Sequence, residues 1–140
     1  MSEPASIRRS FPADPGAPRN ARHLVRNFLR AIGADPRALA DVLLAVSEVV
    51  TNCVVHGYRG QSGGQVAIEA HRRGDTLLLS VADRGLGMAP RPDSPGLGLG
   101  LPLVGRIADR VDISARPGSG TVVRMSFSLS YGTGDDPRGR

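Results

Sequence analysis

The chain has 140 residues, a mass of 14.7 kDa, a formal net charge of +5 and a single cysteine. This length predicts one domain with its own core, and one cysteine excludes an internal disulfide. All 18 basic residues are arginine, which excludes a lysine-based phosphate loop and a lysine-dependent kinase of the eukaryotic type. The arginines are dispersed and 4% of residues are aromatic, a pattern that predicts no direct nucleic-acid binding.

The N-terminal third is expected to form an edge strand and two helices. Residues Ser6–Phe11 predict the strand, which prolines then stop. Apolar residues recur at helical spacing over Leu24–Ile32, and Gly33 is placed to end that helix. Asp35-Pro36 predicts a second helix start, with the aspartate as N-cap. This helix is expected to run to about Val55.

The second helix has a broad apolar stripe that predicts a core position. Its members are Leu39, Val42, Leu43, Val46, Val49, Val50, Cys53 and Val54. Cys53 is interpreted as a small buried core residue rather than a nucleophile. No apolar run approaches the roughly 18 to 20 residues of a membrane span, and the N-terminus is too polar for a signal peptide. The sequence therefore predicts a soluble cytoplasmic protein without membrane contact.

Glu48 and Asn52 lie four residues apart on this helix, which puts both side chains on one side of it. An amide oxygen is a ligand that suits Mg²⁺, and a carboxylate one turn away suits a general base. Taken alone, the two residues are equally typical of a solvated pair on an amphipathic helix.

Two alternating apolar runs, Val66–Ala70 and Leu77–Val81, predict a β-hairpin around Arg73-Gly74-Asp75. The second strand ends at Asp83, whose carboxylate would suit a buried amine donor such as that of adenine. Gly85 and Gly87 follow at fixed offset and leave room for a flat base near the backbone. An aspartate in a strand-end turn is the plainer alternative.

Gly96, Gly98 and Gly100 precede a predicted helix from about Leu99 to Ala108. Backbone amides at such a helix start can bind phosphate oxygens, and Leu101 is included with them as a binding residue. A flexible linker before a core helix is the alternative. It leaves the regular glycine spacing unexplained.

The chain is expected to close with strands over Val111–Ala115 and from Thr121 to Leu129, separated by a Pro-Gly turn. Residues 132–140 are expected to be a disordered tail, which leaves 1–131 as the single domain. Antiparallel strand pairs with grouped helices predict an α+β two-layer sandwich. We expect a mixed, mostly antiparallel sheet covered on one face by about three helices.

A fourth site, Gly118-Ser119-Gly120-Thr121, opens the last predicted strand. Together with the Glu48–Asn52 pair, the segment from Asp83 to Gly87 and the three spaced glycines, in this order, it resembles the nucleotide pocket of the GHKL (Bergerat-fold) ATP-binding superfamily. Residues 47–52, which read Ser-Glu-Val-Val-Thr-Asn and run into His56-Gly57-Tyr58, are most similar to bacterial anti-sigma factors that are serine kinases. The resemblance implies ATP and Mg²⁺ as cofactors, with Asn52 as metal ligand and Glu48 as general base. It also implies that Asp83 accepts from adenine and that Thr121 helps to close the adenine pocket.

The resemblance further implies the partners: an antagonist protein of the STAS type and a sigma factor, with a homodimer left open. Residues 88–95, which correspond to the ATP lid of the family, are short and rich in proline. Two functions therefore stand side by side. One is an anti-sigma factor that phosphorylates a serine or threonine of its antagonist, and the other is a non-catalytic ATP-gated protein-binding module.

Overall fold

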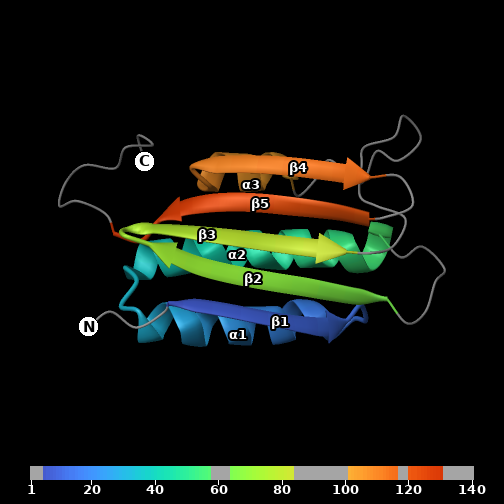
Figure 1. The fold of residues 1–140 in the computed structure, drawn as a ribbon, viewed down its shortest axis with the longest axis horizontal. Coiled ribbons are helices and arrows are strands. Elements are labelled where there is room, and N and C mark those ends of the chain that lie inside the picture. The colour runs from blue at the N-terminus through green and yellow to red at the C-terminus, as the bar shows by residue number, and fades with distance from the viewer. Residues whose placement is uncertain (1–4, 58–63, 84–100, 117–119, 131–140) are drawn as a thin grey trace.

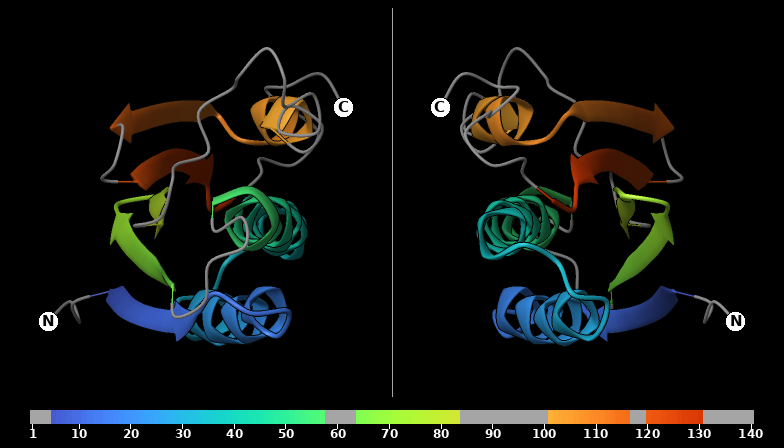
Figure 2. Two further views of the ribbon diagram at one scale, coloured as in Figure 1. Left: turned by 90° about the vertical axis from the view of Figure 1, so that its right-hand side faces the viewer. Right: turned by 90° about the vertical axis from the view of Figure 1, so that its left-hand side faces the viewer.

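The fold is an antiparallel sheet covered on one face by helices, in a computed structural model that describes residues 5–57, 64–83, 101–116 and 120–130. In chain order the elements are β1 (Ser6–Pro12), α1 (Ala17–Ala31), α2 (Pro36–Asn52), the π-helical turn η1 (Cys53–Gly57), β2 (Gln65–Arg73), β3 (Thr76–Asp83), α3 (Leu101–Ile107), β4 (Arg110–Arg116) and β5 (Gly120–Ser128). The strand order is β1-β2-β3-β5-β4, and all three α-helices lie on the same side of the sheet (Figures 1 and 2). The predicted α+β sandwich is confirmed.

Each of the four strand pairings among the described residues is antiparallel, where a mixed sheet was expected. The β2–β3 hairpin turns at Gly74, whose φ of +60° favours glycine because it has no Cβ. Strands β1 and β4 form the two edges, and β3 runs through the middle of the sheet. The hairpin and the final strand pair were therefore predicted correctly.

Helix α1 begins at Ala17, earlier than its apolar spacing indicates, and Gly33 lies just beyond its end with a φ of +75°. Helix α2 begins as predicted, since the Asp35 carboxylate accepts from the Arg37 backbone N–H at 2.8 Å. This contact satisfies one of the N–H groups that a helix start leaves without a helical partner. The two helices pack against one another on the covered face of the sheet.

The chain stays helical to Gly57, close to the predicted end of the second helix near Val55, but its last turn is not α-helical. The α-helix ends at Asn52, and residues Cys53–Gly57 form a wider π turn. At the junction the Cys53 N–H donates to the carbonyl oxygens of both Val49 and Val50. A π turn changes the direction of the side chains that follow it, and such turns occur often at functional sites.

The core lies between the sheet and the helices. Its fully buried large side chains are Val25, Leu29, Val42, Val46, Val49, Val50, Ile68, Leu77, Leu79 and Phe127. The predicted core position of Cys53 is confirmed, since its side chain is fully buried.

The segment Pro36–Val55 has a mean hydropathy of 1.8 and could cross a membrane by length and composition alone, in contrast to the expectation from the sequence. In the fold it is the central helix of the core, covered by the sheet and α1 (Figure 2). A central core helix meets the same criteria of length and composition as a membrane span. The burial of α2 explains its apolar composition.

Candidate functional site

Three elements that carry predicted site residues end or begin at the same end of the molecule, on the right in Figure 1. Helix α2 ends there at Asn52, β3 ends at Asp83, and β5 begins at Gly120. Asp83 and Thr121 are direct partners across the β3–β5 ladder. The fold thus brings residues 52, 83 and 121 to one end of the helix–sheet sandwich.

The buried polar and charged side chains of the described residues are Asn52, Asp83 and Thr121, which are 7%, 2% and 1% exposed. Burying polar groups in an otherwise apolar core costs free energy unless they gain partners. All three are residues that the sequence assigned to one nucleotide pocket. A core built for stability alone would favour apolar side chains at these positions.

Asn52 has a further property that points to a ligand. Its amide nitrogen Nδ2 is buried and has no hydrogen-bond partner in the part of the chain that the structure describes. A buried donor without an acceptor costs about 1 to 3 kcal/mol. The amide fits a metal-bound polyphosphate, because Nδ2 can donate to a phosphate oxygen while Oδ1 remains available to a hard cation.

The pKa of Cys53, the residue after Asn52, reflects the burial and the negative charge at this end of the core. Burial raises the pKa of its thiol far above the ordinary range, and the negative charge of Asp83 adds to the increase. The carboxylate of Asp83 is therefore close enough to act on the first residue of η1, which packs against β3. Cys53 is a neutral packing group and has no role as a nucleophile.

Glu48 lies one helical turn before Asn52 and is half-buried. Its neighbour Ser47 is fixed from two directions, since its hydroxyl donates to the Leu43 carbonyl oxygen at 2.9 Å and accepts from Arg22 Nη1 at 3.2 Å. Arg22 belongs to α1, so this contact ties the two helices together next to Glu48. Among the described residues, no hydrogen bond or ion pair engages the Glu48 carboxylate.

The glycines assigned to base and phosphate contacts, Gly85, Gly87, Gly96, Gly98 and Gly100, lie outside the described residues, and their roles stay predictions. Leu101 is the first residue of α3, and its binding role also stays a prediction.

Sequence reasoning missed two features beside this end of the core. One is the π turn η1. The β-branched residues before Gly57 are weak helix formers, and they could have indicated that the α-helix ends early. The other is the Arg22–Ser47 contact, whose partners are 25 residues apart. No local pattern in the sequence indicates a contact between helices at that separation.

Comparison with known proteins agrees with this geometry. A family model described as a histidine kinase-like ATPase domain matches residues 11–127. The anti-sigma F factor of Thermoanaerobacter sp. (strain X514) is 32% identical over 117 residues, which cover 76% of this chain and 81% of the relative. The anti-sigma F factor of Bacillus subtilis (strain 168) is 27% identical over 121 residues, covering 79% and 83%.

A solved structure of the RsbU and RsbW domains of a Mycobacterium tuberculosis protein superposes with a TM-score of 0.72 at 28% identity. The match covers 91% of this chain, which spans about a third of that longer one. The matched family model extends over most of the described fold, including Asn52, Asp83 and Thr121. The chain therefore belongs to the histidine kinase-like ATPase domain family, and within that family it groups with the anti-sigma F factors.

Proposed function

We propose that this chain is a cytoplasmic, ATP-binding anti-sigma regulatory factor that phosphorylates a serine or threonine of an antagonist protein. The observation that carries the proposal is the coincidence of the three buried polar side chains with three predicted nucleotide contacts. The relatives named anti-sigma F factor supply one class of partner, a sigma factor. The second partner, an antagonist of the STAS type, is the one that the sequence resemblance implies.

The proposed roles follow from the chemistry of each side chain. Asp83, nearly fully buried at the end of β3, accepts a hydrogen bond from the exocyclic amine of adenine. Thr121, opposite it on β5, adds a hydroxyl at the same edge of the pocket. Asn52 supplies Oδ1 to Mg²⁺, which leaves Nδ2 to donate to a phosphate oxygen.

When bound, Mg-ATP supplies the phosphoryl group and the cation that offsets its negative charge. Glu48 holds the proton that the acceptor hydroxyl loses, one helical turn from the metal-binding amide. Its half-buried position suits this role, because a partner's hydroxyl has to reach the carboxylate from outside the chain. The Arg22–Ser47–Leu43 contacts hold the backbone that carries Glu48.

The experiment is phosphoryl transfer from labelled Mg-ATP to the products of neighbouring genes, with the wild type, Glu48→Gln and a control, Thr51→Ala. Glutamine keeps the shape of the side chain but cannot take the proton. We expect ATP binding to persist in Glu48→Gln while transfer falls by about 10² to 10⁴. Thr51 is exposed on the same helix, so its variant should transfer like the wild type.

Two outcomes would contradict the proposal. Phosphoryl transfer by Glu48→Gln at the wild-type rate would show that Glu48 is not the general base. No transfer by the wild type, together with an ATP-dependent change in its affinity for one of these proteins, would make the ATP-gated binding module the correct function.

A further inference from the structure

The outer surface of the helical layer carries a row of positive charge next to Glu48. Helix α1 has four arginines and no acidic residue. Because these arginines are spaced three or four residues apart, they lie on one side of the helix, and we call them the arginine row. Its members are Arg19 and Arg30, which are exposed, and Arg22 and Arg26, which are half-buried.

The arginine row is not neutralised within the part of the chain that the structure describes, where no ion pair engages any of its members. Positive charges on successive turns of one helix repel one another. An anionic partner would relieve this repulsion. Solvated arginines are common on protein surfaces, however, so the row alone indicates no partner.

The position of the row relative to Glu48 indicates its role. Arg22 Nη1 donates to the Ser47 hydroxyl at 3.2 Å, so the row passes beside the residue that precedes Glu48. A short connection joins α1 to α2, and the two helices run in opposite directions (Figure 1). Arg26 and Arg30 therefore lie beside the turns of α2 that come before Glu48, away from the nucleotide end of that helix.

An exposed apolar side chain lies on the same stretch of α2. Leu44 precedes Glu48 by four residues, which is one helical turn or about 6 Å along the axis. It is 40% exposed, one of the few large apolar side chains exposed among the described residues. The other sides of α2 pack against α1, α3 and the sheet, so its exposed residues share the side that faces outward. Glu48, Leu44 and the arginine row therefore adjoin one another.

From this arrangement we propose that the arginine row and Leu44 bind the segment of the antagonist that carries the phosphorylated hydroxyl. The inference rests on the proposed function, which makes Glu48 the base for that hydroxyl. With the acceptor serine or threonine at Glu48, one side of the segment lies over the preceding turns of α2. The surface then selects a segment that is acidic and has an apolar residue close to the acceptor.

The dimensions of the two helices convert into positions in the acceptor segment. An extended chain advances about 3.3 Å per residue, so the distance of about 6 Å from Glu48 to Leu44 corresponds to two residues. Arg26 and Arg30 lie about 6 and 12 Å beyond Arg22 along α1. We therefore expect an apolar residue two positions from the acceptor, and Asp or Glu two to four positions from it on the same side.

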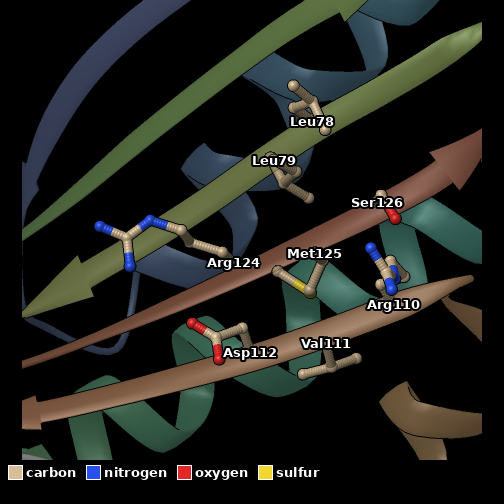
Figure 3. Close-up of a pocket in the computed structure, with 8 residues that line it drawn as sticks. All are labelled: Leu78, Leu79, Arg110, Val111, Asp112, Arg124, Met125 and Ser126. Atoms are coloured by element: carbon tan, nitrogen blue, oxygen red, sulfur yellow. The ribbon is translucent and has the colours of Figure 1, made fainter.

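The sheet face away from the helices offers no equivalent surface among the described residues. A hollow of about 560 Å³ on that face is lined by residues that include Arg110, Asp112 and Arg124, and Figure 3 shows the helices behind the sheet that carries them. Asp112 shares this hollow with both arginines, so the charge there is mixed. A segment bound in the hollow would be separated from Glu48 by the sheet.

A nucleic acid is another anionic ligand that an arginine row could bind. The negative charge of Glu48 beside the row would repel its phosphates, and Leu44 offers no aromatic ring on which a base could stack. An acidic protein segment with an apolar residue suits both the arginines and Leu44.

Steady-state phosphoryl transfer tests the proposal, with labelled Mg-ATP and the neighbouring gene product that the wild type phosphorylates. In Arg26→Glu the KM for this acceptor protein should rise at least about tenfold, because an attraction becomes a repulsion. Loss of the apolar contact in Leu44→Ser should raise the same KM about fivefold. The affinity for Mg-ATP, measured by calorimetry, should stay at the wild-type value, because neither residue contacts the nucleotide in our account.

The matched controls are Arg73→Glu and Ile113→Ser. Arg73 is exposed at the end of β2, and Ile113 is 37% exposed on β4. These variants repeat the charge reversal and the loss of an apolar side chain away from the proposed surface, so both should keep the wild-type KM. Thermal unfolding with and without Mg-ATP establishes that each variant is folded. Salt at about 0.5 M should reduce the difference in KM between the wild type and Arg26→Glu by screening.

A charge exchange identifies the contact itself. In the acceptor protein, each Asp or Glu within about five positions of the phosphorylated residue is changed to Arg and tested with the wild type and with Arg26→Glu. One such substitution should raise the KM with the wild type and lower it with Arg26→Glu, because opposite charges meet again. A purely structural effect of Arg26→Glu would not be rescued by a change in the partner.

The outcomes separate this inference from the proposed function. Transfer by the wild type with an unchanged KM in both Arg26→Glu and Leu44→Ser would overturn the inference and leave the proposed function intact, even if Arg26→Glu lost affinity for a sigma factor or for single-stranded DNA. Equal rises of KM in the controls, or no rescue by any substitution in the acceptor, would do the same. Absence of transfer by the wild type would contradict the proposed function itself, and the inference would fall with it.

Discussion

At the scale of single residues, the buried polar groups distinguish this core from one built for stability alone. Asn52, Asp83 and Thr121 lie where apolar side chains would pack at lower cost. Proteins retain such groups where function requires them. Their placement at the ends of α2 and β3 and the start of β5 explains how one pocket can draw residues from distant parts of the sequence.

The variant Asn52→Ala separates function from stability at this position. Since Nδ2 has no acceptor among the described residues, its loss should change the free energy of unfolding by no more than about 1 kcal/mol. The stabilisation of the wild type by Mg-ATP, measured as a rise in melting temperature, should disappear. Thr51→Ala is the exposed control. A variant that keeps the full magnesium-dependent rise would show that the metal ligand lies elsewhere.

Cys53 gives a prediction for the pH dependence of stability. Burial raises its thiol pKa above the ordinary value of 9.0, so the unfolded chain ionises first as the pH rises. The contribution of the Cys53 thiol to the free energy of unfolding is therefore fully present below about pH 9 and is lost progressively as the pH rises above that value. Between pH 9 and 10.5 the free energy of unfolding should fall more steeply in the wild type than in Cys53→Ala, by up to about 1.4 kcal/mol per pH unit. If the free energy of unfolding fell equally with pH in the wild type and in Cys53→Ala, this role of the Cys53 thiol would be contradicted.

At the scale of elements, α2 is defined by a strong start and an irregular end. Its N-cap was predictable from the Asp35-Pro36 pair alone, because both residues act locally. The end of α2 was not predictable, because the π turn η1 packs against β3, a contact that no local pattern in the sequence indicates. The hairpin at Gly74 belongs with the predictable features, since turn chemistry is also local.

Asp35→Ala tests the start of α2. Loss of the cap should destabilise the protein by about 1 kcal/mol, measured by urea unfolding. Arg37 Nε lies 3.8 Å from the same carboxylate, and the Arg37 side chain is largely exposed. The variant Arg37→Ala controls for this weak ion pair and should lower the free energy of unfolding by less than Asp35→Ala does. Equal losses in both variants would assign the effect to the ion pair instead of the cap.

At the scale of the whole molecule, the end of the helix–sheet sandwich where α2, β3 and β5 meet carries the proposed nucleotide chemistry. The sequence could predict the residues of this end because each motif is a short segment of consecutive residues. It could not predict the strand order β1-β2-β3-β5-β4, because β3 pairs with β5, which does not follow it directly in the chain.

Recognition of adenine by Asp83, at the end of β3, is measured directly by titration calorimetry of nucleotide binding. GTP presents a carbonyl oxygen where ATP presents its amine, so the wild type should bind ATP clearly more tightly than GTP. Asp83→Asn should lose about 1.5 to 3 kcal/mol of ATP binding, roughly 10- to 150-fold in affinity. Unchanged ATP affinity in a folded Asp83→Asn variant, or equal affinity of the wild type for the two nucleotides, would contradict the account.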